Sequence, residues 1–183
     1  GIAGTANELL VACSPSKKTS TQTLFHTNMQ QSPLPYAYSA LEDVIDTQTM
    51  EIHYQRHAAG YAKALQEEAK VAGLSSDTSV EKILEKISSY STKMRNNAGG
   101  HYNHELFWKC MRPKRNNNKP EGELAARIES TFQSFENFKL EFTTASTSRF
   151  GSGWAWLYVD KNKILRIGST PNQDNPLMNV SDI

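Results

Sequence analysis

Cysteine is scarce in this chain of 183 residues: there are two, Cys13 and Cys110, too few for a disulfide framework. No apolar run reaches the roughly 18 residues that a membrane-spanning helix needs. Neither sign of charge is in excess, since 20 basic and 19 acidic residues leave a net charge of +1. These absences argue against a disulfide-stapled, membrane-spanning or strongly nucleic-acid-binding protein.

The densest basic stretch is RPKRNNNK, residues 112–119. It carries three asparagines and is interrupted and followed by prolines, which are loop signals. We therefore interpret it as a solvated connection and expect no nucleic-acid partner. The remaining composition, with 38% hydrophobic and 21% charged residues, is typical of a globular protein of one domain or two small lobes.

The first residues differ in composition from the rest. The stretch begins without methionine, runs through small and apolar residues to LVAC, and then turns polar. LVAC followed by Ser14 resembles the lipobox of a bacterial lipoprotein, in which the cysteine becomes lipidated. The alternative is a disordered tail with an incidental cysteine, since Glu8 interrupts the apolar run and no charged segment precedes it.

On the first interpretation, residues 1–32 are a clipped signal-like tail and a polar tether. Membrane attachment would then occur through Cys13, and the protein would be exported to the periplasm, the envelope or the extracellular space. A cytoplasmic location is the alternative.

Helical patterns dominate residues 33–115, which we expect to form an antiparallel helical hairpin. After an extended start at PLPYAYSALEDVI, a long helix is predicted over residues 47–73, capped by Asp46 or Thr47 and ended by Gly73. A connecting helix is predicted over residues 79–90, with Asp77 or Ser79 as its cap. The next helix carries NNAGGHYNHELFWKC and runs to Met111, because Pro113 stops it.

Residues 116–183 predict an α/β domain, so the fold class is α+β. Residues 122–150 read as two helices, with Ser134 able to cap the second. Residues 151–170 alternate and are rich in Trp, Tyr, Val and Ile, which indicates two strands joined at DKN. A two-stranded hairpin alone is marginal. We therefore expect a final strand and further helices to be missing from the sequence given.

Four histidines and a tyrosine fall on two predicted helices at spacings that align them. They are His53, His57 and Tyr61 on the long helix, and His101 and His104 on the later one. The first three lie at i, i+4 and i+8, on a face that also carries Met50 and Leu65 and so points inward. A single inward histidine is more often a core residue than a ligand, but this grouping favours a metal site. The pattern lacks the glutamate of the HExxH zinc motif.

Two glycines precede His104 by one turn of helix. Gly99 and Gly100 each cost about 1 kcal/mol of helix stability relative to alanine. Their use is to remove side chains where another group must lie against the backbone. Phe107 and Trp108 follow, and would wall the site with apolar surface.

Five separated motifs are similar to one known family. They are LPYAYSALE, MEIHYQRHAAGY, NNAGGHYNHELFW, FGSGWAWL and STPNQDNPLM, in this order. From about Leu34 to its last residue the chain resembles an iron/manganese superoxide dismutase. The resemblance implies a helical hairpin followed by an α/β lobe with a small antiparallel sheet. It also implies disproportionation of superoxide to dioxygen and hydrogen peroxide at one Mn (or Fe) centre, in a homodimer or higher homo-oligomer.

The resemblance implies a role for each matching residue. His53 and His104 take the places of two metal ligands, Tyr61 and His57 those of the pair that gates access and supplies protons, and Trp108 and Trp154 those of the aromatic shell. Gln173 matches the glutamine that hydrogen-bonds solvent at the metal. With Gly100, it follows the manganese pattern, so Mn is expected and Fe is possible. Arg56 is a candidate for steering the anionic substrate, or is a plain surface arginine.

The family completes its metal site with an aspartate and a histidine from a DVWEHAYY-like motif, which the sequence given does not contain. We expect that the sequence is clipped at both ends and that these ligands lie downstream. One alternative is a family-derived, non-catalytic structural or interaction protein lacking a complete metal site. Another is a different redox protein that reuses the hairpin.

Overall fold

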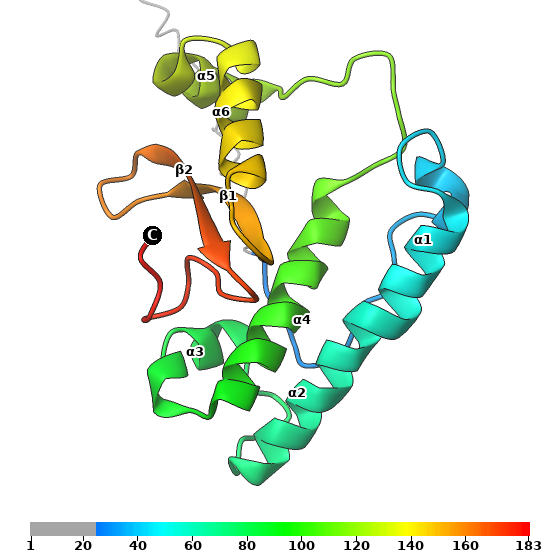
Figure 1. Ribbon diagram of the computed structural model, residues 1–183, viewed down its shortest axis with the longest axis vertical. Helices are drawn as coiled ribbons and strands as arrows, with labels where there is room; N and C mark the ends of the chain where they lie inside the picture. Colours follow the sequence, from blue (N-terminus) through cyan, green and yellow to red (C-terminus); the bar gives the residue numbers. More distant parts are fainter. Residues whose placement is uncertain (1–24) are drawn as a thin grey trace, which may run out of the picture.

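A computed structural model describes residues 25–183, so the LVACS stretch and Cys13 lie outside the described residues (Figure 1). Helices α1 to α4 form one lobe, and α5, α6 and the β1–β2 hairpin form the other. Over residues 25–183, no helix combines the length and the apolar character that crossing a bilayer requires. This order of elements confirms the predicted α+β class.

The first arm of the helical hairpin is one rod made of α1 (Thr47–Ile52), the π-helical segment η2 (His53–Ala58) and α2 (Ala59–Val71). Asp46 caps it, because its carboxylate accepts from the backbone N–H of Thr49. Gly73 lies just past its end with φ +67°, and the N–H of Leu74 reaches the carbonyl of Ala69 at 2.9 Å. This is the glycine-based C-terminal motif that the sequence predicts.

The π-helical segment is a feature that the sequence periodicity does not indicate. It replaces a regular α-helix over His53–Ala58, the stretch that holds both histidines of this rod. Single π-turns inside α-helices occur mostly at functional sites, because they change the direction of side chains at the cost of regular hydrogen bonds. The local distortion therefore coincides with the candidate site.

The second arm is α4 (Thr92–Cys110), capped by Ser91 and ending before Pro113. Before it come η1 (Tyr38–Leu41), α3 (Val80–Leu84) with Ser79 as its cap, and η3 (Ile87–Ser89). The two arms enclose a core whose central side chains are at most 1% exposed: Leu65, Ile83, Leu84, Ile87, Met94 and Ala98. The predicted hairpin is thus held by apolar packing along α2 and α4.

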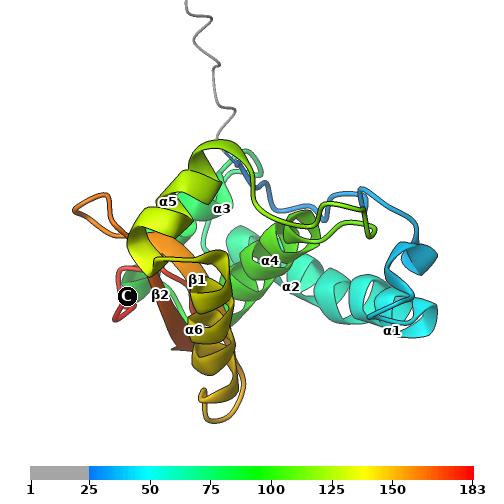
Figure 2. The ribbon, with the colours of Figure 1, turned by 90° about the horizontal axis from the view of Figure 1, so that it is seen from above.

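The second lobe contains α5 (Gly122–Phe132), α6 (Phe135–Thr147), β1 (Gly153–Val159) and β2 (Leu165–Pro171). Seen from above, α5 and α6 lie over the β1–β2 hairpin, and α4 lies between the hairpin and the α1–α2 rod (Figure 2). The strands pair antiparallel, from Gly153 opposite Pro171 to Val159 opposite Leu165. Ser134 caps α6, as the sequence predicts. Within residues 25–183 the sheet has these two strands.

After β2 the chain returns to the helical hairpin. Met178 is 3% exposed and belongs to the hairpin core, and Asn179 exchanges hydrogen bonds with Ser88. Residues 172–178 are therefore held between the lobes, against α4. The basic stretch between α4 and α5 forms no helix or strand over residues 111–121, which agrees with its interpretation as a loop.

Residues 25–32, assigned above to the polar tether, pack against the hairpin. Thr27 and Ser32 donate their backbone N–H groups to the carboxylates of Glu81 and Glu105, at 2.8 and 3.1 Å. Met29 is 5% exposed in the main core. Composition alone could not show this, because the partners lie 54 and 73 residues away along the chain.

Candidate metal centre

Three imidazoles meet where the η2 segment crosses α4. The ligand-capable atoms of His53, His57 and His104 all lie within 4.8 Å of one another. The Nε2 atoms of His53 and His104 are 3.1 Å apart, a separation compatible with both binding one ion at about 2.1 Å each. The fold thus brings together the two histidines that the resemblance named as ligands.

The tautomer of His104 is set by its neighbour. Its Nδ1 lies 2.6 Å from the carbonyl oxygen of Gly100, and because a carbonyl can only accept, Nδ1 carries the proton. This leaves the Nε2 lone pair directed at His53. A backbone or carboxylate partner on the far nitrogen is the usual support of a metal-binding histidine.

Burial favours the neutral form of the His53 and His104 imidazoles. It lowers the pKa of His104 to about 4 and also lowers the pKa of His53. A neutral imidazole is the form that binds a metal. The site is therefore ready for a cation at neutral pH without first losing a proton from His104.

The donor set is all nitrogen in the described part of the chain. Three imidazoles suit a first-row transition metal, and no carboxylate of residues 25–183 joins them. His57, to which the resemblance gives a proton-transfer role, is the exposed member of the cluster. The aspartate and histidine expected downstream remain predictions.

Aromatic rings surround half-buried His53 and buried His104. The Trp108 ring, 3% exposed, lies 5.0 Å from the His53 ring, and the Trp154 ring lies 5.1 Å from His104. Phe107 bridges the two sides, 6.0 Å from His53 and 5.6 Å from Trp154. These walls limit water and lower the local dielectric, which strengthens every charge interaction inside.

The glycine pair of α4 leaves room for two groups of the site. A Cβ on Gly100 would lie 2.5 Å from the Tyr61 ring, and a Cβ on Gly99 would lie 2.1 Å from the backbone oxygen of Gln173. Both distances are shorter than real contacts of this kind. The glycines therefore admit a side chain from α2 and a backbone segment from after β2.

Gln173 is the polar centre of the site. Its Nε2 donates to the Tyr61 hydroxyl at 3.1 Å, and its Oε1 accepts from Trp154 Nε1 at 3.0 Å. Since the amide donates to the phenol oxygen, the phenol proton is free to point elsewhere. The Nδ2 of Asn103 also donates to the Gln173 backbone oxygen at 3.0 Å. Sequence reasoning missed Asn103, although its place one helical turn after Gly99 was a usable signal.

Two residues named above lie outside the cluster. Arg56 is exposed beside His57 in the η2 segment, so its steering role stays a prediction. His101 is 1% exposed and places a ring nitrogen 2.8 Å from the carbonyl oxygen of Asn28. It is a satisfied core histidine that holds the N-terminal segment.

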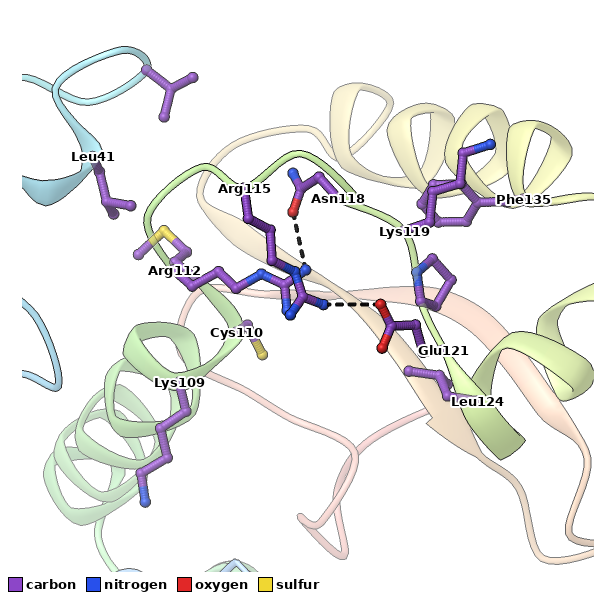
Figure 3. Close-up of a pocket in the computed structure, with 13 residues that line it drawn as sticks. Leu41, Lys109, Cys110, Arg112, Arg115, Asn118, Lys119, Glu121, Leu124 and Phe135 are labelled. Carbon is purple, nitrogen blue, oxygen red and sulfur yellow. Dashed lines mark hydrogen bonds and ion pairs between the residues drawn. The ribbon is translucent and has the colours of Figure 1, made fainter.

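A cavity of about 580 Å³ lies away from the histidines, between the end of α4, the basic loop and the start of α5 (Figure 3). Arg112 and Arg115 reach into it, and Arg115 pairs with Glu121 at 3.4 Å. None of the predicted metal, proton-transfer or aromatic residues lines it.

Fold and site together define an α+β protein with a histidine-rich metal site between its lobes. Residues 23–112 match the family described as iron/manganese superoxide dismutases, alpha-hairpin domain, and residues 120–183 match its C-terminal domain. The chain belongs to the iron/manganese superoxide dismutase family.

Named relatives agree with this assignment. The chain is 44% identical to "Superoxide dismutase [Mn]" of Acinetobacter baylyi over 84% of the chain and 67% of that protein. It is 46% identical to "Superoxide dismutase [Mn] 1" of Leptolyngbya boryana over 80% of the chain and 60% of that protein. It is 45% identical to "Superoxide dismutase [Fe]" of Raoultella planticola over 79% of the chain and 86% of that protein. The match thus spans only 60% of the second relative's length.

Proposed function

We propose that the protein to which this chain belongs is a superoxide dismutase with one Mn, or Fe, per chain. The observation that carries the proposal is the pair of neutral imidazoles of half-buried His53 and buried His104, with Nε2 atoms 3.1 Å apart, beside the hydrogen-bonded pair of Tyr61 and Gln173. Family membership and the Mn- and Fe-type relatives support the same reaction. The non-catalytic alternative has no observation in its favour.

When bound, the metal would supply the one-electron redox chemistry that disproportionation of superoxide requires. The protein's part is to hold the ion, to exclude water and to deliver the two protons of hydrogen peroxide. His53 and His104 would hold the ion through neutral ring nitrogens, the form of imidazole that binds a metal. Trp108 and Trp154 keep bulk water from it.

Tyr61 is the proposed proton donor beside the histidines, with its ring 5.4 Å from that of His104. Its oxygen already accepts from Gln173, so its own O–H can donate toward the substrate. His57 is the next group outward, with its ring 5.1 Å from that of Tyr61 and exposed to solvent. A proton therefore has a short route from solvent through His57 and Tyr61.

The preference for Mn rests on Gly100 and Gln173. With glycine at position 100, the amide beside Tyr61 comes from the loop after β2. We also propose that Arg56 steers superoxide and that the active protein is a homodimer or larger, in keeping with the resemblance.

Metal content in the full-length protein tests the ligand assignment. We expect His104→Ala to lose most of its Mn or Fe by elemental analysis, because one of the ligand nitrogens is removed. The control is His26→Ala, since the His26 side chain is 69% exposed and does not belong to the cluster of His53, His57 and His104. Equal metal content in the two variants would contradict the assignment.

Turnover tests the role of the amide. Gln173→Leu has a similar volume and keeps the metal ligands, but cannot bond Tyr61 or Trp154. We expect the metal to stay and superoxide turnover to fall about 10-fold to 100-fold, the usual cost of losing an outer-shell partner. Unchanged turnover would remove Gln173 from the mechanism.

We propose export to the cell envelope, with Cys13 as the lipid-bearing residue, on the basis of the LVACS stretch alone. The location of the protein is measured by fractionating cells with and without an inhibitor of lipoprotein processing, and cells that carry Cys13→Ala. We expect the wild-type protein in the envelope fraction, and less of it there with the inhibitor or with Cys13→Ala. A protein found unprocessed in the cytosol would reject it.

A further inference from the structure

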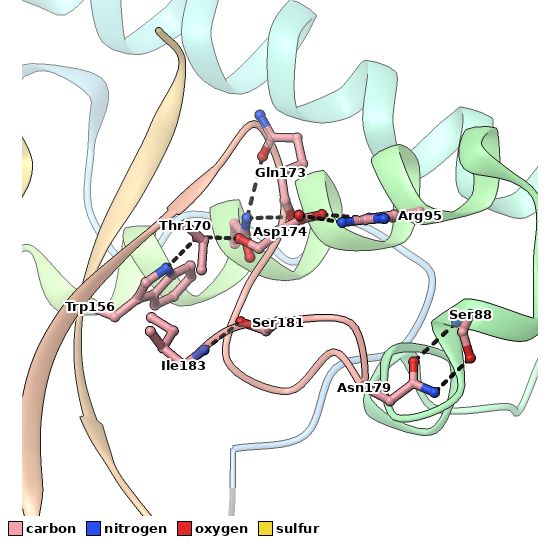
Figure 4. Close-up of polar contacts among 10 residues, drawn as sticks. Ser88, Arg95, Trp156, Thr170, Gln173, Asp174, Asn179, Ser181 and Ile183 are labelled. Carbon is pink, nitrogen blue, oxygen red and sulfur yellow. Dashed lines mark hydrogen bonds and ion pairs between the residues drawn. The ribbon is translucent and has the colours of Figure 1, made fainter. Parts of the chain in front are cut away.

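One face of α4 meets the loop that carries Gln173. The face is formed by Arg95, Gly99 and Asn103, which lie at i, i+4 and i+8 and so fall in one line along the helix. Each meets the loop in a different way: Gly99 by lacking a side chain, Asn103 through its amide, and Arg95 through its charge. Figure 4 shows Arg95 reaching Asp174 directly beside Gln173.

Arg95 binds Asp174 with two parallel hydrogen bonds. Its Nε donates to Oδ1 at 2.7 Å and its Nη2 donates to Oδ2 at 2.5 Å. Asp174 is 8% exposed, so water does not readily replace the guanidinium. A two-point contact between planar groups fixes direction as well as distance, which a single ion pair does not.

Asp174 is held from the sheet as well. Its backbone carbonyl accepts from the Thr170 hydroxyl at 2.6 Å, and that hydroxyl accepts from Trp156 Nε1 at 2.8 Å. On the other side of Gln173, Asn172 has a left-handed φ of 50°, a turn conformation that asparagine tolerates. Gln173 therefore lies in a tight turn, next to a residue tied to both lobes.

The position of this turn determines whether the Gln173 amide reaches its partners. The bonds to Tyr61 and Trp154 are 3.1 and 3.0 Å long, so a shift of a few tenths of an ångström takes them past normal bonding distance. The Gln173 backbone cannot move toward α4, because its oxygen already lies against Gly99. It can move away, and the Arg95–Asp174 pair opposes that movement.

We propose that Arg95 and Asp174 are a positioning pair that holds the Gln173 amide beside the metal site. The inference rests on the proposed function, because it concerns the group that the proposed function assigns to Gln173. Neither residue touches the reacting atoms; both act through the backbone of Gln173.

The test uses the full-length, metal-loaded protein and the variant Arg95→Met. The matched control is Lys93→Met, which removes another ion pair of α4, Lys93 with Glu68 at 2.7 Å, without touching the loop. The measurements are metal content, the visible spectrum and reduction potential of the bound metal, and superoxide turnover. We expect Arg95→Met to keep its metal, to shift the spectrum and potential, and to lose about 10-fold in turnover.

Lys93→Met should match the wild type in all four measurements. Arg95→Lys keeps the charge but not the two-point contact, so it should lie between Arg95→Met and the wild type. If Arg95→Met does not fold, Asp174→Asn, which removes the charge but not the shape, gives the same comparison. A spectrum and potential equal to those of Lys93→Met would overturn the proposal.

The proposed function fails on a different result. A metal-loaded wild type without superoxide turnover would reject that function. The spectrum and potential of Arg95→Met against Lys93→Met would still decide whether the pair positions Gln173.

Discussion

Gly99→Ala measures how closely α4 and the Gln173 turn fit together. A methyl group there would lie 2.1 Å from the Gln173 backbone oxygen and 2.7 Å from the end of Met178. Met178 can rotate, but a backbone oxygen moves only with its whole turn. Forcing an extra carbon into such a contact costs about 1–3 kcal/mol of folding stability.

The same substitution also has a favourable effect that a control must remove. Alanine gains up to about 1 kcal/mol over glycine in a helix interior. Gly60→Ala supplies this control, since Gly60 lies in helix α2 and nothing is within 4 Å of its added Cβ. We expect Gly60→Ala to stabilise the protein, and Gly99→Ala to be about 1–3 kcal/mol less stable than Gly60→Ala.

Urea unfolding of the two full-length variants, prepared without metal, gives the difference in their folding stability from the two transition midpoints. Superoxide turnover of the metal-loaded forms adds a second measurement, because a displaced turn carries Gln173 away from Tyr61. Equal midpoints and equal turnover would show that the Gln173 turn moves away from Gly99 at no cost. The close fit inferred between α4 and this turn would then be refuted.

Acidification tests whether the histidine ligands are neutral. Burial lowers the pKa of His104 to about 4, so this side chain gains a proton only near that pH. Metal content after dialysis should therefore stay constant from pH 7 to about pH 5 and fall near pH 4. In the metal-free protein, the unfolded chain binds this proton at a higher pH than the folded chain. Stability should therefore decrease as pH falls below about 6.5, by up to about 3 kcal/mol near pH 4, in unfolding curves at each pH; an increase would refute the assigned direction. Residues 1–183 expressed alone should bind Mn weakly and associate, because the described cluster has no carboxylate and Phe150 is 99% exposed. A soluble, Mn-saturated product by chromatography and elemental analysis would contradict this.

Local signals in the sequence were sufficient for most of the helices and strands. Asp46, Ser79 and Ser134, all named from the sequence, cap helices, and the DKN turn joins the strands, because capping and turn formation depend on neighbours within a few residues. His53 and His104 were named as ligands because they sit in two motifs that resemble the iron/manganese superoxide dismutase family, and the fold brings their Nε2 atoms to within 3.1 Å of each other. The π-helical form of His53–Ala58 was not predicted, since its pattern of apolar residues is the same as that of an α-helix.

What only the tertiary structure decided is how distant segments meet at α4. The sequence showed that Gly99 and Gly100 must admit something; the fold shows that Gly100 admits the ring of Tyr61 and Gly99 admits the backbone of Gln173. Likewise, nothing local in Arg95 indicates its bond to Asp174, which lies 79 residues away. Helix caps and apolar helix faces depend on residues a few positions apart, so the local sequence predicts them. Contacts between distant segments depend on how whole helices and strands pack against each other, and the local sequence does not specify that packing.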